Sequence, residues 1–311
     1  IAILYGETGP DVISLSWGAG ISPDKSTGDS GPDEAAKVYS VYTTTLDTIF
    51  KLFGAMGVTV IAGSGDTGIS SSESVPVSLS TYNVTTDNVT TEQWREQPRF
   101  DCGRVAFYPA SSAYVTAVGG TQLAAAPRCT DDTQKWHTER GNGATAACVE
   151  EIVCSASTAG GITSGGGFVT GYSPESSYLW QRAAVKRYSG HLREHLASRD
   201  PSHGPYFDPD SAVRSVAGLA RGRGYPDVAA LGHACVTIMN GAVTPMDGTS
   251  CSTPLFAGLV SLMNAELAAL GEPPLGFLNP TLYAAPPSVF NDVTHGDTSS
   301  AEIAGVSCTT G

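Results

Sequence analysis

Apolar and polar positions near the start of the chain follow the periods of a strand, a helix and a second strand. Residues 11–17 (DVISLSW) alternate apolar with small or polar side chains and stop before a glycine, which predicts a strand. Residues 33–56 repeat apolar side chains at helical spacing and end at Gly57, a residue type favoured just beyond a helix. Residues 57–62 (GVTVIA) predict a short buried strand. Strand, helix and strand in this order form the unit of a parallel sheet.

The same kinds of pattern extend the prediction to a single α/β domain over residues 1–311. Further strands are predicted at residues 114–118 and near 235–239, and a further helix at residues 175–188. After Ser250 the chain is apolar on nearly every face, which is typical of a central buried helix. Two polar or cysteine-rich stretches, about 70–106 and 122–163, are predicted to be loop insertions.

Composition and charge argue against several function classes. The hydrophobic share of 41% and the charged share of 15% describe a globular chain with a sizeable core rather than a disordered one. The formal net charge is −13 and basic residues form no run, so nucleic acid and anionic membrane are not expected as partners. No stretch has the ~18 consecutive apolar residues of a membrane span, so no membrane insertion is expected.

The cysteines and two sequons favour a secretory route. None of the seven cysteines takes part in the C-x2-C spacing typical of a zinc site, and their clustering in loops favours disulfides. An odd number of cysteines leaves at least one thiol unpaired within the chain. Asn83 and Asn88 each begin an N-x-T sequon in a polar stretch, where a glycan would be tolerated. We therefore expect a glycoprotein of the lysosome, the vacuole or the extracellular space.

The stretch DGTSCSTP, residues 247–254, places a serine at the start of the long apolar helix. At a helix N-terminus Ser250 gains from the helix dipole and from free backbone N–H groups that can bind an oxyanion. Two interpretations stay open, because Ser250 is either a nucleophile or, like Thr249, a residue that caps the helix. Cys251 is interpreted as a small packing residue that is sensitive to oxidation.

Several motifs, in order along nearly the whole chain, resemble those of one peptidase family. GTSCSTP resembles the nucleophile motif of the subtilisin fold, and SLSWG at residues 14–18 resembles the substrate-binding strand of that fold. SGDTG at residues 64–68 has Asp66 where subtilisins carry an oxyanion-hole Asn, and this exchange is the signature of the sedolisins, the serine-carboxyl peptidases. Further matches are PASSAYVTAVGGT (109–121), SGGGF (164–168), YPDVAAL (225–231), PPLGFLNPTLY (273–283) and FNDVTHG (290–296). PPLGFLNP and STPLFAG look most like the lysosomal tripeptidyl peptidase branch.

The resemblance implies a subtilisin-like α/β fold, with a mostly parallel central sheet, helices on both faces and a buried central helix after Ser250. It also implies an acid-active endopeptidase or tripeptidyl peptidase that hydrolyses peptides or proteins. Ser250 would be the nucleophile that forms the acyl-enzyme, and Asp66, protonated at acidic pH, would donate to the oxyanion. Substrate would bind at Ser16, Trp17, Gly18, Gly165, Gly166 and Gly167. The alternative for Trp17 is a place in the core.

The general base of the sedolisins is a Glu that is oriented by an Asp one helical turn later. Because that pair precedes the SLSWG strand by some tens of residues, we expect it upstream of residue 1, together with a propeptide. The segment is thus expected to be truncated at both ends and inactive on its own. Glu7 and Asp11 have the spacing of the pair. The intervening Gly9 and Pro10 prevent the helix that would align the two carboxylates.

The resemblance further implies a structural Ca²⁺ site near the C-terminus. Asp292 and Val293 match the start of that site, where an Asp carboxylate and the next backbone carbonyl are ligands. Gly311 matches the first glycine of the motif that closes it. Oxygen ligands of this kind suit Ca²⁺. The alternative is that Asp292 caps a loop.

Two other functions are weighed against the acid peptidase. A subtilisin-type Ser-His-Asp peptidase needs a His ahead of a helix, and His203 comes nearest to that motif but lies in a Pro/Asp-rich stretch. A catalytically inactive homologue or binding scaffold is the other alternative, since the Glu/Asp pair is not in the sequence. The intact Asp66 and Ser250 argue against the scaffold.

Overall fold

A five-stranded, mostly parallel sheet forms the centre of the molecule. The computed structural model describes residues 9–21, 34–68, 106–125, 149–169, 175–188, 190, 222–298, 300–303 and 306–308. The parallel strands are, in spatial order, β1 (Val12–Leu15), β3 (Thr59–Gly63), β5 (Thr116–Ala125) and β9 (Val228–Leu231). The fifth strand, β6 (Val149–Val153), runs antiparallel to β5. It pairs with residues 121–125 of β5, on the same edge of β5 where β3 pairs with residues 116–118. The predicted α/β fold with a mostly parallel sheet is confirmed.

The other elements surround this sheet. The helices are α1 (Glu34–Ala55), α5 (Thr249–Ala269) and α6 (Asn279–Ala284), and the 3-10 helices are η4 (Ala156–Thr158), η5 (Glu175–Gln181) and η6 (Pro287–Val289). Antiparallel pairs are β2 (Ala19–Ile21) with β4 (Ala106–Tyr108), β7 (Gly167–Val169) with β8 (Arg223–Tyr225), β10 (Cys235–Met239) with β11 (Ala242–Met246), and β12 (Ser300–Ile303) with β13 (Val306–Cys308). None of the helices that the structure describes is long and apolar enough to cross a membrane.

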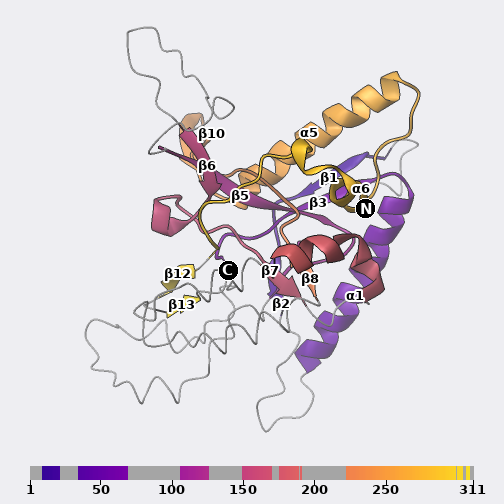
Figure 1. Ribbon diagram of the computed structural model, residues 1–311, viewed down its shortest axis with the longest axis horizontal. Coiled ribbons are helices and arrows are strands. Elements are labelled where there is room, and N and C mark those ends of the chain that lie inside the picture. Colours follow the sequence, from indigo (N-terminus) through magenta and orange to yellow (C-terminus); the bar gives the residue numbers. More distant parts are fainter. Residues whose placement is uncertain are drawn as a thin grey trace.

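Helices cover both faces of the sheet, because alternate residues of β3 point to opposite sides. Val60 and Ala62 pack with Phe50 of α1 in one hydrophobic cluster. Ile61, between them, packs with Phe256 of α5 in the other. Figure 1 shows α1 and α5 on opposite sides of β1, β3 and β5. Every residue of β3 is buried, which confirms the prediction of a short buried strand there.

α5 is buried along the side that faces the sheet. Phe256 and Val260 lie in the core cluster, with 9% and 0% of their surface exposed. On the other side Leu255, Leu259 and Leu262 are 57%, 50% and 67% exposed. In the described part of the chain, the predicted burial on nearly every face therefore holds only for the sheet-facing side. A contiguous apolar surface of this kind is characteristic of a face that another protein segment covers.

The structure moves the boundaries of several predicted elements. Residues 122–125 belong to β5 and residues 149–153 form β6, so the predicted insertion at about 122–163 contains part of the central sheet. The strand predicted near 235–239 is present as β10, but it pairs with β11 and not with the central sheet. The predicted helix at 175–188 is present as η5 followed by helical residues 182–188. The predicted insertion at about 70–106 lies outside the described residues apart from its last position.

A buried ion pair links the first residue of β8, Arg223, to Asp227, the residue directly before β9. Arg223 and Asp227 are 2% and 0% exposed, and Arg223 Nη2 lies 2.6 Å from Asp227 Oδ2. The same carboxylate accepts hydrogen bonds from Ala117 N (2.8 Å) and from the Tyr283 hydroxyl (2.8 Å). A buried pair is tolerated when its remaining hydrogen-bonding capacity is satisfied, as it is here. The contacts fix β8, β5 and α6 relative to the start of β9.

Candidate active site

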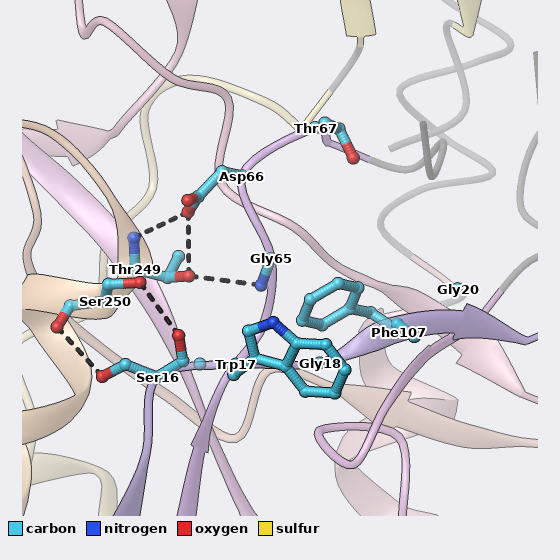
Figure 2. A pocket seen from close by; sticks show the side chains of 12 residues that line it. Ser16, Trp17, Gly18, Gly20, Gly65, Asp66, Thr67, Phe107, Thr249 and Ser250 are labelled. Carbon is cyan, nitrogen blue, oxygen red and sulfur yellow. Dashed lines mark hydrogen bonds between the residues drawn. The ribbon is translucent and has the colours of Figure 1, made fainter. Parts of the chain in front are cut away.

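Ser250 lies in the first turn of α5, where the carboxyl ends of β1 and β3 reach the helix. Sites in parallel sheets form at this end of the strands. The exposed Ser250 hydroxyl donates to the backbone oxygen of Ser16, 3.2 Å away, and the Ser16 hydroxyl donates to the backbone oxygen of Ser250, also at 3.2 Å (Figure 2). These two bonds tie the segment after β1 to the helix and leave the Ser250 hydroxyl open to solvent.

The cap of α5 is not a serine or threonine. Gly248 occupies the N-cap position and no side chain of the cap residue bonds the helix. The N–H of Thr249, one of the free donors of the first turn, donates instead to Asp66 Oδ1 at 2.8 Å. The interpretation of Thr249 or Ser250 as a mere helix cap is therefore wrong, because a carboxylate from the β3 loop takes that place.

Thr249 also orients the carboxyl group of Asp66. The Thr249 hydroxyl donates to the same Oδ1 atom at 2.9 Å and accepts a hydrogen bond from Gly65 N at 3.2 Å. Because Oδ1 accepts two hydrogen bonds, a proton on this half-buried carboxyl group belongs on the other oxygen, Oδ2. Asp66 is thus oriented by two hydrogen bonds to Oδ1, and Thr249 makes no bond to Oδ2.

Asp66 Oδ2 and the N–H of Ser250 face the same small space. A Cβ atom added to Gly248 would lie 3.3 Å from Asp66 Oδ2, 3.5 Å from Ser250 N and 3.6 Å from Ser250 Cβ. A side chain at position 248 would fill this space, which the glycine leaves open beside the Ser250 side chain. An N–H group and a carboxyl oxygen that converge beside a serine hydroxyl have the arrangement that an oxyanion hole requires, provided that the carboxyl group carries a proton.

A cleft of about 270 Å³ opens beside Ser250. Its lining residues are Ser16, Trp17, Gly18, Ala19, Gly20, Gly63, Gly65, Asp66, Thr67, Phe107, Thr249 and Ser250. Figure 2 shows Ser16, Thr249, Asp66 and Ser250 grouped at one end, with Trp17 and Phe107 towards the other. Trp17 is 78% exposed, so it forms a wall of the cleft and is not a core residue. The structure therefore brings the predicted Ser16, Trp17 and Gly18 together with Asp66 and Ser250.

Phe107 is a lining residue that the sequence did not indicate. It reaches the cleft because β4 pairs with β2, and a Cβ atom on Gly18 would lie 2.5 Å from the Phe107 ring. The Phe107 N–H donates to the hydroxyl of the buried Tyr225 at 3.0 Å. Burial raises the pKa of Tyr225 to about 12, so this anchor stays protonated in acid and at neutral pH. No local pattern around Phe107 marks these distant partners.

Residues 165–167 begin with a glycine that packs against the backbone of the turn before Asp66. Gly165 N donates to Gly65 O at 2.7 Å, and a Cβ atom on Gly165 would lie 2.1 Å from Ser64 O. Only a glycine allows this close backbone approach. None of the three glycines is among the residues that line the cleft, so their binding of substrate stays a prediction.

The described residues place no side-chain base on Ser250. Among them, His233 bonds Asp247 and His295 bonds Glu150, whereas the hydroxyl of Ser250 bonds the backbone of Ser16. Glu7 and His203, which were weighed as possible bases from the sequence, lie outside the described residues. The described residues thus hold the predicted nucleophile, Ser250, and the predicted oxyanion-hole residue, Asp66.

Of the predicted metal and glycan positions, the structure describes Asp292 and Val293. Asp292 is exposed and Val293 is half-buried, and together they offer two oxygen donors of the about six to eight that Ca²⁺ takes. No group of three or more His, Cys, Asp or Glu residues within the described ranges is arranged to hold a metal ion. Gly311, Asn83 and Asn88 lie outside those ranges.

Disulfides were predicted from the number and clustering of the cysteines. In the described part of the chain, Cys154, Cys235 and Cys251 form no disulfide. Cys102, Cys129 and Cys148 lie outside it, so the prediction stays open for them, as it does for Cys308.

Comparisons with known proteins agree with this geometry. The model of the Subtilase family matches residues 2–272. The chain is 31% identical to physarolisin of Physarum polycephalum over 296 residues, which cover 94% of this chain and 44% of that protein. It is 33% identical to tripeptidyl-peptidase 1 of Rattus norvegicus over 271 residues, which cover 85% and 35%. Kumamolisin of a Bacillus species is 29% identical over 293 residues, covering 93% and 36%.

A solved structure shares the fold. Pseudomonas sedolisin, a serine-carboxyl proteinase complexed with two molecules of pseudo-iodotyrostatin, superposes with a TM-score of 0.51 at 20% sequence identity. The match covers 93% of this chain and 56% of that structure. The chain spans less than half the length of the curated relatives named above.

Proposed function

Because the chain belongs to the subtilase family and, within it, to the sedolisins, we propose that the protein is an acid-active serine-carboxyl peptidase that cleaves peptides or proteins. The observation that carries the proposal is the convergence of Asp66 Oδ2 and Ser250 N on one space beside the Ser250 side chain. The relative named tripeptidyl-peptidase 1 supports release of tripeptides, and endopeptidase cleavage is the second mode that we propose.

The proposed reaction begins at the Ser250 hydroxyl. Its oxygen attacks the carbonyl carbon of the scissile peptide bond, and the carbonyl oxygen becomes an oxyanion in the space beside Gly248. There it accepts hydrogen bonds from Ser250 N–H and from a protonated Asp66 Oδ2. Collapse of this intermediate releases the amine and leaves an ester on Ser250, which water then hydrolyses through a second oxyanion in the same place.

The need for a protonated Asp66 makes this chemistry acidic. An ionised carboxylate has no proton to donate and would repel the oxyanion. Thr249 bonds only Oδ1, so the orientation of the group does not depend on the proton that Oδ2 carries. A His base would be charged in acid, which favours a carboxylate as the base for Ser250. We place that carboxylate in a part of the protein outside the described residues.

Two measurements on the full-length protein test the proposal. A fluorophosphonate should label Ser250, as read by peptide mass spectrometry, and peptide hydrolysis should fall as the pH rises from acid to neutral. An internally quenched peptide with a blocked N-terminus reports endopeptidase action. A tripeptide with a free N-terminus and a fluorophore on its C-terminus reports tripeptidyl release. Hydrolysis that is confined to neutral pH, or labelling of another residue, would contradict the proposal.

Gly248→Ala is expected to lower kcat by about tenfold or more. The new Cβ would lie 3.3 Å from Asp66 Oδ2 in the proposed oxyanion space, and the φ angle of +154° is unfavourable for alanine. Gly241→Ala is the matched control, because Gly241 also has a positive φ, +80°, but an added Cβ there has no neighbour within 4 Å. Steady-state kinetics should show loss of turnover in Gly248→Ala alone, and equal loss in both variants would count against the oxyanion space.

We also propose that the whole protein binds a structural Ca²⁺ through the Asp292 carboxylate and the Val293 carbonyl. Support comes from the exposed position of Asp292 and from the oxygen chemistry of both donors. Chelation should lower the melting temperature of the full-length protein, since at a hundredfold excess over Kd a bound ion adds about 2.7 kcal/mol. Asp292→Ala should lower it equally and no longer respond to chelator. An unchanged melting temperature in the chelated wild type would argue against the site.

The sequons support a further proposal, that the protein passes through the secretory pathway to a lysosome, a vacuole or the extracellular space. Asn83 and Asn88 would carry N-linked glycans. Protein from the native source should lose mass on treatment with a glycan-removing amidase, and the double variant Asn83→Gln/Asn88→Gln should not. An unglycosylated native protein would remove this support.

A further inference from the structure

Two thiols, those of Cys235 and Cys251, lie against each other beside the Ser250 turn. Cys235 is the first residue of β10 and Cys251 belongs to the first turn of α5. Both are free and partly buried, and their side chains are hydrogen-bonded to each other. Neither lines the cleft that contains Ser250, so the pair has no part in the proposed peptidase chemistry.

The backbone brings the two thiols together independently of the sulfur contact. The joining contacts are Gly248 N to Gly232 O (2.8 Å), Ala234 N to Asp247 Oδ1 (2.8 Å) and the pairing of Cys235 with Met246 across β10 and β11. Ala234, directly before Cys235, has a left-handed φ of +52°, a conformation that a non-glycine residue keeps only when its surroundings hold it. These contacts hold the backbone before Cys235 beside the turn that leads into Cys251.

The electrostatic surroundings distinguish the two sulfur atoms. Burial, and then the hydrogen bond to Cys251, raise the pKa of the Cys235 thiol to about 12. The raised pKa disfavours the thiolate form of Cys235. An oxidant reacts with a thiolate, so the first attack is assigned to Cys251, and Cys235 is its resolving partner.

We propose that Cys235 and Cys251 form a redox-active pair that a hydroperoxide converts to a disulfide, fastening the first turn of α5 to the base of the β10–β11 hairpin. Hydrogen peroxide transfers one oxygen to the sulfur of Cys251, which gives a sulfenic acid and one water. The sulfur of Cys235 then attacks that of Cys251. The S–S bond forms, the S–O bond breaks, and the proton of Cys235 leaves with the oxygen as a second water.

Cys154 is the nearby thiol that does not join the pair. It is fully buried, and its sulfur donates to Gly160 O at 3.1 Å. It still contributes to the raised pKa of Cys235, which places it in the neighbourhood. Cys154→Ala is therefore a matched control, since it removes a neighbouring sulfur without removing either member of the pair.

Trapping with dimedone tests the order of the two steps on the full-length protein. After treatment with hydrogen peroxide, wild type should yield a Cys235–Cys251 cross-linked peptide in mass spectrometry. Cys235→Ser should instead accumulate a dimedone adduct on Cys251, whereas Cys251→Ser should form no adduct on Cys235. A cross-link from Cys251 to any other cysteine, or an adduct that appears first on Cys235, would overturn the assignment.

Thermal stability and amide hydrogen exchange test whether the disulfide links the first turn of α5 to the β10–β11 hairpin. The oxidised wild type should melt about 5 °C above the reduced protein, because the bond closes a loop between β10 and α5. Amide hydrogens in residues 249–253 should exchange more slowly after oxidation. Cys154→Ala should show the same difference between oxidised and reduced protein, and Cys235→Ser and Cys251→Ser should show none. Equal melting temperatures for oxidised and reduced wild type, with the cross-link present, would refute the fastening.

Discussion

Ser250→Ala should reduce peptide hydrolysis by the full-length protein roughly 10⁴- to 10⁶-fold. In the proposed reaction this hydroxyl forms the acyl-enzyme, and its removal leaves Asp66, the Ser250 N–H and the cleft in place. KM should therefore change much less than kcat. The measurement is steady-state kinetics in acid, together with loss of fluorophosphonate labelling.

Ser252→Ala is the control for that substitution. Ser252 lies two positions further along α5, is fully buried, and its hydroxyl has no hydrogen-bond partner among the described residues. Its removal should leave both turnover and labelling close to wild type. If Ser250→Ala kept wild-type turnover, Ser250 would not be the nucleophile and the scaffold alternative would gain weight.

Asp66→Ala should cost about 10²- to 10³-fold in kcat, because it removes one of two oxyanion donors. It also removes the acceptor of the Thr249 N–H bond, so part of the loss would reflect a less ordered first turn of α5. Asp66→Asn separates the two contributions. An amide can accept from Thr249 through its oxygen and donate from its nitrogen at every pH, so it should retain more activity than Ala.

The pH profile is the decisive readout for Asp66. Wild type should lose activity as the pH rises and the carboxyl group ionises. Asp66→Asn should not show this decline of activity with rising pH. Asp247→Asn is the control, since Asp247 is near Ser250 in sequence but bonds Ala234 and His233, away from the oxyanion space. An Asn variant whose profile falls at the same pH as wild type would show that Asp66 does not carry the titrating proton.

Elements with a strong local period could be predicted from the sequence, and pairings between distant segments could not. α1 was predicted within a residue of its ends because its apolar side chains repeat over six turns and stop at a glycine. β9 was missed, since Val228–Leu231 is too short to show a period and is partly exposed. Its place in the sheet depends on β5, whose residue Val118 pairs with Val228 from across the chain.

The residues of the site likewise fall into two groups, those that a local motif indicates and those that only the fold brings to the cleft. Ser250 and Asp66 could be predicted because their neighbouring residues form motifs with a chemical meaning. Gly248 stands in the same motif, but its role depends on a distance to Asp66 Oδ2 that only the folded chain sets. Phe107 has no motif at all, and it enters the cleft through the pairing of β4 with β2. Sequence reasoning therefore indicated Ser250 and Asp66 in the cleft but not the walls around them.

The order of strands in the central sheet has a consequence for how the chain folds. Val12 pairs with Thr59, Ile61 with Thr116 and Val118 with Val228, so each parallel pairing closes a long loop. The entropy of loop closure is lost before the contacts of the sheet form, which makes folding slow. Unfolding must break the same sheet as a unit, so the lifetime of the native state is expected to depend on the height of the unfolding barrier. For the proposed peptidase, which would be exposed to cleavage by other copies of itself, the height of that barrier would set how long the native state survives.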